Sequence, residues 1–337
     1  MFDVELLTNN QSYIDWKTLS LVRSIEQLAG GFEITGKRGD ENLIKPGEPI
    51  SLFLNDESVL AGYVDAVELR YDSQSDNQKV VARDVVADLV DCSLGAKEYH
   101  DQTLLQVASD IALDFNIEVQ AHVDTGAPFK VASVNPGDSP FSVIERLARA
   151  RGLLIMSDAT GALIITRAGL NRAKTSLQYG VNILGGEATF SHEQLFSEYT
   201  VVGDRKSTSE AWGSNVQSKA TATDDRVGRY RPFVFVSDTD GDAVTFKDRA
   251  TWQRNVAFGR AKRVKYSVPG WYDGTQLWQP NTVVKVEDPR LNINEDLLIV
   301  SVTLEKSERG AITSLELTRP EAFDLIALPL SEVTNAW

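Results

Sequence analysis

Two stretches of sequence decide the fold: residues 103–115, TLLQVASDIALDF, and residues 139–152, SPFSVIERLARARG. Apolar residues in the first stretch recur every three or four positions, which places them on one face of a helix. The second stretch begins with Ser139, a natural N-cap, and Pro140 occupies the first helical position, where its missing N–H costs no hydrogen bond. Gly152 is a natural residue to end that helix. The sequence therefore predicts two amphipathic helices.

Two short strands are expected directly after the second helix. Residues 153–156 (LLIM) and 162–166 (ALIIT) are apolar and flank the turn DATG at residues 158–161. The helices and this hairpin together predict a small α/β module, packed on the outside of the surrounding β structure. Its expected core residues are Phe115, Phe141, Ile144 and Leu147.

Most of the remaining sequence has the alternation that is typical of strands. The strand candidates are residues 19–23, 32–35, 50–54, 59–71 and 80–84 in the N-terminal part, and 283–287, 297–306 and 312–318 in the C-terminal part. In both parts a turn with proline leads into a strand, a long alternating strand and a final strand. We interpret this repeated order as two similar β-barrels, with the α/β module between them.

The segment between residues 204 and 263 has a different character. Residues 204–242 are rich in Ser, Thr, Gly and Asp, which is typical of long mobile loops, and residues 248–263 predict one more helix. The expected fold class is mainly β with α+β parts. We expect a first β-barrel domain over residues 1–95, a small α/β module over 96–170, a second β-barrel domain over 171–203 and 264–323, a loop-rich and helical insertion over 204–263, and a C-terminal tail over 324–337.

Bulk composition narrows the class of protein. With 337 residues, 42% hydrophobic and 24% charged, the chain is long enough for two or three globular domains. No apolar run approaches the length of a membrane span, and residues 1–5 lack the features of a secretory signal. Cys92 is the only cysteine, which excludes an intrachain disulfide and a thiolate metal cluster and fits folding in a reducing cytosol.

The formal charge of −14 is distributed unevenly. Residues 203–265 contain 13 Lys and Arg against 8 Asp and Glu, a local charge of +5, so the remainder carries −19. A strongly acidic protein disfavours nucleic-acid binding. The basic segment, for example Arg260, Lys262 and Arg263, is able either to steer an acidic neighbour during assembly or simply to remain solvated.

The search for catalytic and metal sites gives no candidate. An acidic loop at residues 237–242 (SDTDGD) lacks the glycine and glutamate of a calcium loop, because Ala243 and Arg249 occupy those positions. The three histidines, His100, His122 and His192, lack the spacing of zinc ligands. No nucleophile elbow, phosphate loop or dinucleotide fingerprint is present. We therefore predict no catalytic, cofactor or metal residue, and no enzyme activity.

Several short phrases in a fixed order carry a resemblance to a known family. They are Pro46-Gly47, Leu60–Asp65 (LAGYVD), Ala82–Asp84 (ARD), Ala87–Ser93 (ADLVDCS), Asn182–Gly186 (NILGG), Phe196–Tyr199 (FSEY), Val201–Gly203 (VVG), Gly270-Trp271, Asp273-Gly274, Leu277-Trp278, Leu297–Val300 (LLIV) and Pro320–Phe323 (PEAF). Together they resemble the baseplate hub proteins of Mu-like contractile-tailed bacteriophages over nearly the whole chain. The broad family includes late-control D proteins, the hub of T-even phages and the N-terminal part of type VI secretion spike proteins.

The resemblance implies a structural role and defined partners. It implies a homotrimeric ring of six barrels that adapts the sixfold tail tube to the threefold membrane-puncturing spike, with its lumen on the DNA path. The implied partners are the spike protein, the tail tube and other baseplate proteins, with no specific nucleic-acid binding and no membrane insertion. The implied location is the baseplate of the virion tail, assembled in the cytoplasm of the bacterial host. The family supplies no catalytic residue and no cofactor.

Two alternatives remain open from the sequence. Residues 137–152 also resemble the opening of a LysM module, so a peptidoglycan-binding or peptidoglycan-cleaving tail component is the competing function. The same fold also serves in a phage-tail bacteriocin or an injection device, which the sequence does not separate from a phage.

Overall fold

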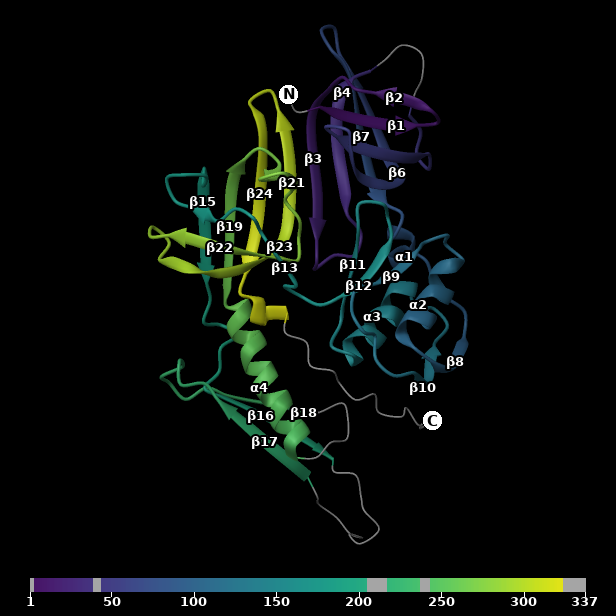
Figure 1. The fold of residues 1–337 in the computed structure, drawn as a ribbon. Coiled ribbons are helices and arrows are strands. Elements are labelled where there is room, and N and C mark those ends of the chain that lie inside the picture. Colours follow the sequence, from purple (N-terminus) through teal and green to yellow (C-terminus); the bar gives the residue numbers. More distant parts are fainter. Residues whose placement is uncertain (1–2, 39–43, 205–216, 237–242, 324–337) are drawn as a thin grey trace.

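The computed structural model describes residues 3–38, 44–204, 217–236 and 243–323. Strands dominate it, which confirms the expected mainly β class, and most of them belong to one 14-stranded sheet. Figure 1 shows two β units side by side, a small α/β module below the first unit and a strand-and-helix insertion below the second. No helix among the described residues has both the length and the apolar character that crossing a membrane requires.

The first β unit is the N-terminal half of the large sheet. Its strands are β1 (Val4–Thr8), β2 (Gln11–Tyr13), β3 (Trp16–Ser24), β4 (Gly31–Lys37), β5 (Pro49–Leu54), β6 (Glu57–Tyr71) and β7 (Asp76–Asp84). Neighbouring strands pair antiparallel in the order β2-β1-β5-β6-β7-β4-β3. Residues of β5 and β7 alternate between buried and half-buried, as expected for strands with one face on a core.

The α/β module follows the first unit directly. Its elements are α1 (Ala87–Asp91), β8 (Lys97–Gln102), α2 (Leu104–Leu113), β9 (Val119–Ala121), β10 (Phe129–Val134), α3 (Pro140–Ala150), β11 (Leu154–Ser157) and β12 (Leu163–Thr166). Both predicted helices are present. The hydroxyl of Ser139 accepts the N–H of Ser142 and so caps α3, and Thr103 forms a capping box with Gln106 at α2.

The module has its own hydrophobic core, separate from that of the β units. Ile144 and Leu147 are fully buried there, as predicted. Phe115 and Phe141 pack against the same cluster but remain half-exposed, so they cover the core instead of filling it. The predicted hairpin is formed by β11 and β12, and β9 adds a parallel third strand.

The second β unit completes the large sheet. Its elements are β13 (Asn171–Arg172), β14 (Leu177–Gln178), β15 (Gly185–Phe190), β19 (Lys262–Pro269), β20 (Tyr272–Asp273), β21 (Gln276–Leu277), β22 (Thr282–Asp288), β23 (Ile293–Ser307) and β24 (Gly310–Thr318), followed by the 3-10 helix η1 (Pro320–Phe323). Strands β20 and β21 form a small hairpin outside the large sheet.

The insertion between β15 and β19 is more ordered than expected. It contains β16 (Glu198–Asp204), β17 (Gln217–Thr223), β18 (Pro232–Val236) and α4 (Ala243–Arg260), and α4 packs on β16 and β17. Residues 217–223 and 232–236 are therefore strands, where the sequence predicted loops. The predicted helix at 248–263 starts earlier and ends at Arg260, because Lys262 and Arg263 already pair with β15 and β24.

The boundaries of the insertion also differ from the expectation. Residues 198–203, which the sequence places in the second β unit, belong to β16, and β16 pairs with β17 and β18 and not with the large sheet. The sheet pairing therefore places the insertion between the end of β15 and the start of β19. The acidic loop at residues 237–242 and the tail at 324–337 lie outside the described residues.

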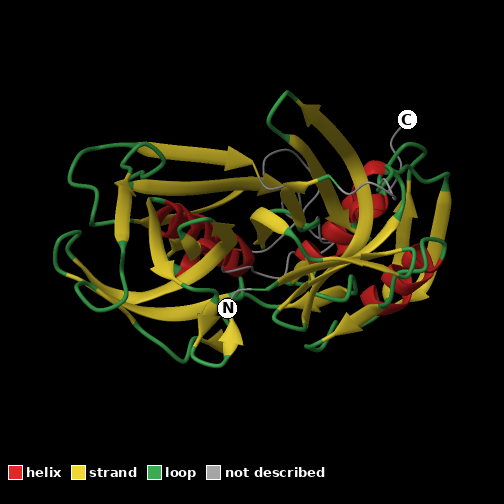
Figure 2. Cartoon of the chain, turned by 90° about the horizontal axis from the view of Figure 1, so that it is seen from above, coloured by secondary structure: helices red, strands yellow, loops and turns green. Residues whose placement is uncertain are grey.

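The two β units are not closed barrels in the described residues. The second half of β23 pairs with β3 through residues 301–306, so hydrogen bonding continues from one unit into the other. A single hydrophobic core runs through both units, and the view from above shows them side by side (Figure 2). The two separate barrels expected are therefore not confirmed, because β3 of the first unit and β23 of the second join the described strands into one sheet.

The predicted repetition between the two units is visible in their pairing. Strands β6 and β23 each have 15 residues, and β7 and β24 each have 9. Val64 pairs with Ala82, and Ile299 pairs with Leu317. Both residues of the second pair have numbers 235 higher than those of the first (299 minus 64, and 317 minus 82). The register of both hairpins shifts directly after these pairs. The two hairpins are therefore the same structural unit used twice.

Candidate functional site

The described residues hold no group of His, Cys, Asp and Glu suited to a metal ion. His100, His122 and His192 are all exposed; His100 lies on β8, whereas His122 and His192 lie in the loops after β9 and β15. Cys92 is exposed and free.

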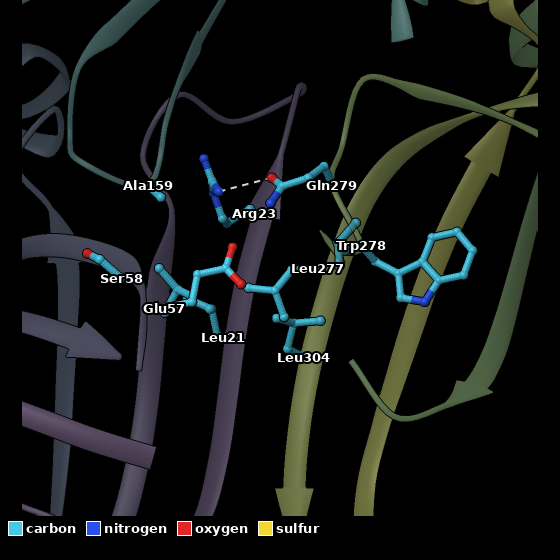
Figure 3. A pocket seen from close by; sticks show the side chains of 11 residues that line it. Leu21, Arg23, Glu57, Ser58, Ala159, Leu277, Trp278, Gln279 and Leu304 are labelled. Carbon is cyan, nitrogen blue, oxygen red and sulfur yellow. Dashed lines mark hydrogen bonds between the residues drawn. The ribbon is translucent and has the colours of Figure 1, made fainter. Parts of the chain in front are cut away.

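A small pocket lies where the two β units meet (Figure 3). It is lined by Leu21 of β3, Glu57 at the start of β6 and Leu304 of β23, together with Leu277 and Gln279. Only about 20 Å³ of it is open to the centre of a water molecule, which is room for one or two waters. The pocket is thus a packing irregularity at the junction and is too small to hold a ligand.

Arg23 at the edge of this pocket ties three parts of the chain together. Its guanidinium donates 3.1 Å to the side-chain oxygen of Gln279, as Figure 3 shows, and 2.9 Å to the carbonyl of Ser157. Burial lowers the pKa of Arg23, and the negative charges of Asp84 and Asp158 oppose that shift. Because Arg23 lies on β3, Ser157 on β11 and Gln279 before β22, this side chain fixes the module and both units to one another.

Asp84 at the end of β7 is the buried carboxyl of the same joint. Its Oδ2 accepts the N–H of Gly30 at 2.8 Å and lies 2.7 Å from Oγ of Ser157, while its Oδ1 has no hydrogen-bond partner. Burial raises the pKa of Asp84 to about 6, although the bonds to Ser157 and Gly30 and the charge of Arg23 act against the shift. The cluster positions the module and contains no nucleophile or base directed at solvent.

Two of the three basic residues chosen from the sequence have partners inside the chain. Lys262 is buried and forms an ion pair with Glu295 of β23. Arg263 forms an ion pair with Glu26, in the turn that joins β3 and β4. Arg260, at the end of α4, is exposed. The charges of Lys262 and Arg263 thus serve the fold, which argues against the steering role considered for them.

Two strand edges on the surface are candidate sites for pairing with another chain. The first half of β6 pairs with β5, but in the described part of the chain residues 66–71 have a strand neighbour on one side only, which is β7. This half exposes Leu69 and Tyr71, at 45% and 79%. Strand β15 ends the large sheet, and its only strand neighbour among the described residues is β19. Phe190 on β15 is 58% exposed.

Exposed strand edges with apolar side chains are surfaces for pairing with another chain. Local sequence patterns do not identify such an edge, because an edge is defined by the absence of a neighbouring strand. One signal was present in the sequence: the alternation of residues 59–71 continues past the part that β5 covers.

Known proteins match the chain along most of its length. The family described as "Mu phage baseplate assembly protein GpP-like, N-terminal" matches residues 3–84, "Baseplate hub protein gp44-like, second domain" matches 86–167, and "Mu phage baseplate assembly protein GpP, fourth domain" matches 243–326. The baseplate hub protein gp44 of Escherichia phage Mu is 29% identical over 338 residues, which cover 95% of this chain and 88% of that protein.

Solved structures of tail and secretion proteins are similar to this chain as well. The 43 kDa tail protein of prophage MuSo2 from Shewanella oneidensis is 31% identical, with a TM-score of 0.85 over 96% of this chain and 99% of that chain. The Escherichia coli c3393 protein, a type VI secretion component described as similar to the T4 tail proteins gp27 and gp5, has a TM-score of 0.60 at 12% identity. That alignment covers 93% of this chain and 76% of c3393, and it shows a shared fold alone.

Proposed function

Because this chain belongs to the baseplate hub proteins of Mu-like phages, we propose that it forms a homotrimeric ring at the centre of a contractile-tail baseplate. In this proposal the ring adapts the sixfold tail tube to the threefold spike, and its lumen lies on the path of the DNA. The chain is a structural component of the virion tail, assembled in the host cytoplasm, with the spike, the tube and other baseplate proteins as partners. In this proposal its role is structural and requires neither catalysis nor a cofactor.

The observation that carries the proposal is the duplicated β unit. The hairpins β6–β7 and β23–β24 share length, register and bulge position, and the two units are joined edge to edge through β3 and β23. Three chains with two equivalent units each supply six units, which is the number that a sixfold tube requires. Among the described residues, the second half of β6 and the outer side of β15 have no strand neighbour, which gives each chain a way to continue this arrangement.

The surplus of negative charge supports the second part of the proposal. The chain has a formal charge of −14, so a lumen lined by part of this surplus repels phosphate and lets DNA pass without adhering. The hub is therefore expected to bind double-stranded DNA negligibly at physiological salt. A mobility shift with the assembled trimer measures this, and tight, salt-sensitive binding would overturn the channel.

The native mass is the principal test of the ring. Multi-angle light scattering of the isolated chain, and of the chain mixed with its spike protein, is expected to give three copies per particle in at least one of the two samples. A monomer in both samples at high concentration would overturn the proposal. A muramidase assay and a cell-wall pull-down on the same preparation test the peptidoglycan alternative. No observation in the described residues favours that alternative.

A further inference from the structure

We infer that neighbouring hub chains join by antiparallel pairing of the second half of β6 from one chain with β15 of the next. This inference rests on the proposed ring and deepens it, because it names the strands, the register and the contacts of the interface between chains. Its basis is the junction that already exists inside one chain, where the long strand β23 of the second unit pairs with β3 of the first.

The equivalence of the strands follows from pairing alone. In the first unit, Ala82 of β7 pairs with Phe32 of β4, and Phe32 pairs with Leu21 of β3. In the second unit the same steps lead from Leu317 of β24 to Val264 of β19 and on to Ala188 of β15. Since Ala82 and Leu317 occupy the same place in the two hairpins, β15 is the counterpart of β3.

The register of the expected interface follows from the same equivalence. Inside the chain, Leu21 of β3 pairs with Leu304 of β23. Leu304 pairs with Thr313 and Leu69 pairs with Gln78, again 235 residues apart (304 minus 69, and 313 minus 78), so Leu69 is the counterpart of Leu304. The pair equivalent to Leu21 and Leu304 is therefore Ala188 of one chain and Leu69 of the next.

This register brings together side chains that suit one another. The pairs expected across the interface are Val67 with Phe190, Glu68 with Thr189, Leu69 with Ala188, Arg70 with Glu187, and Tyr71 with Gly186. Arg70 and Glu187 are both exposed and have opposite charges, and opposite charges directly across an antiparallel pair are stabilising. The charge match played no part in the alignment, so it supports the register independently.

The burial of the two leucines supports the same conclusion. Leu304, whose edge is covered by β3, is 4% exposed, whereas Leu69 is 45% exposed on the uncovered half of β6. Val67 already packs against the main core, and Leu69 lies two positions further along the same face of the strand. A neighbouring β15 extends that core over Leu69, as β3 does over Leu304.

Geometry requires that the partner is a second chain. Strands β6 and β15 lie on opposite sides of the molecule in Figure 1, so they are not able to pair within one chain. The pairing rule at the internal junction joins the long strand of one unit to the β3-type strand of the other. The same pairing between chains, with β6 in the place of β23 and β15 in the place of β3, continues the sheet with antiparallel strands.

Engineered disulfides test the register directly. In a Cys92→Ser background, the full-length double variant Glu68→Cys with Thr189→Cys is expected to oxidise into species of two and three covalently linked chains. The control Glu68→Cys with Gly185→Cys places the second thiol four residues out of register, at a glycine whose Cβ has free space, and is expected to stay unlinked. The internal counterpart, Val22→Cys with Thr303→Cys, reports whether a pair of this geometry oxidises within one chain.

The outcomes separate this inference from the proposed function. A trimer by light scattering that fails to link through residues 68 and 189, while the internal pair oxidises, overturns the inference and leaves the ring intact. Equal linking by the out-of-register control also overturns it. A chain that stays monomeric with and without spike protein overturns both.

Charge reversal gives a second, non-covalent measurement. Arg70→Glu and Glu187→Arg are each expected to raise the dissociation constant between chains by about two- to fivefold at low salt, as expected for a cross-strand charge pair. Combining the two substitutions is expected to restore the wild-type value, because the pair is then re-formed with its signs exchanged. Additive weakening in the double variant would contradict the register.

Discussion

The hairpins β6–β7 and β23–β24 have the same lengths, register and bulge, yet their surroundings differ. The outer half of β23 is covered by β3, and its Leu304 is buried. The corresponding half of β6 has no covering strand in the described part of the chain, and its Leu69 is exposed. The strand pairing within the hairpin is thus the same with and without a neighbour on the outer edge, whereas the burial of the leucine differs.

The ends of the two hairpins differ in the part of the chain that they contact. Asp84 ends β7 and approaches Ser157 of the α/β module. Arg319 stands at the corresponding position after β24, 235 residues later (319 minus 84), and contacts the insertion. Its guanidinium donates to the carbonyl of Phe258 at 3.3 Å and lies 4.0 Å from the ring centre of that residue. The same position of the hairpin thus contacts the α/β module in the first unit, through an acidic residue, and the insertion in the second unit, through a basic residue.

The largest expected effect comes from removing the two corresponding leucines. Leu304→Ala is expected to lower the free energy of unfolding by about 2–5 kcal/mol, because it deletes a buried side chain from the main core. Leu69→Ala is expected to change it by less than about 0.5 kcal/mol in a dilute monomer, since this side chain is exposed there. Denaturant unfolding measures both.

A third variant calibrates that measurement. Leu147→Ala, in the separate core of the α/β module, is expected to cost about 2–5 kcal/mol as well. If Leu69→Ala destabilises the monomer as much as Leu304→Ala does, the contrast between the two hairpins is wrong.

The next effect concerns Asp84 and depends on pH. Its pKa of about 6 in the folded protein lies above its ordinary value of 3.8, so the folded state binds the proton more tightly. Protonated Asp84 therefore contributes its full amount to the free energy of unfolding below about pH 4, and this contribution is lost as the pH rises through 6. Two pKa units correspond to a change of about 3 kcal/mol at most.

Asp84→Asn removes this titration. Between pH 4 and pH 7 the free energy of unfolding of the variant, relative to the wild type, is expected to rise by up to about 3 kcal/mol. Urea unfolding of both proteins across this range measures the difference, and the other carboxylates cancel in it. Parallel pH curves for the two proteins would show that Asp84 is not a penalised buried carboxyl.

A smaller effect is expected at a cross-strand pair whose side chains differ in size between the two units. The cross-strand pair of Leu19 and Ile34 in the first unit corresponds to Gly186 and Tyr266 in the second. The ring of Tyr266 is fully buried, and its hydroxyl donates to Asp288 at 3.0 Å. A Cβ on Gly186 would lie 2.7 Å from that ring, which leaves no room for it.

Gly186→Ala is therefore expected to cost about 1–3 kcal/mol of stability through overpacking. Gly185→Ala is the matched control on the same strand, because nothing lies within 4 Å of its added Cβ, and it is expected to change stability by less than about 0.5 kcal/mol. Thermal unfolding of the two variants provides the comparison, and equal midpoints would contradict the assigned packing.

The smallest effect is expected from the ion pair between the units. Arg263 of β19 and Glu26 after β3 are both substantially exposed, at 38% and 41% for their side chains. Arg263→Ala is expected to cost no more than about 1 kcal/mol and to leave the native mass of the assembly unchanged. A loss of assembly in this variant would restore the steering role that the sequence suggested for the basic segment.

Local patterns in the sequence predicted the elements whose burial is regular. The periodicity of residues 103–115 and the cap at Ser139 gave both helices of the module, and the alternation of residues 59–71 and 297–306 gave the two long strands. The short strands β17 and β18 were missed. β18 alternates only between exposed and half-buried residues, so its sequence lacks the contrast that identifies a strand.

The candidate interface was not predictable in the same way. Its residues are ordinary strand residues, and Leu69 has the same place in its hairpin as the buried Leu304. The difference arises from the pairing of β3 with β23, which joins residues such as Leu21 and Leu304, 283 positions apart (304 minus 21). No local pattern encodes such a contact, because alternation sets which face a residue has but not which strand lies beside it.

The sequence by itself determined the mainly β class, the helices of the module, the duplication of the hairpin and, through its resemblance, the family. These properties are carried by local periodicity, caps and short phrases, which act over a few residues. Only the tertiary structure decided that the units share one sheet and that Arg23 and Asp84 form the joint with the module. It also decided that the second half of β6 and the outer side of β15 have no strand neighbour among the described residues. These features depend on which distant segments meet, and the packing of the whole chain settles that.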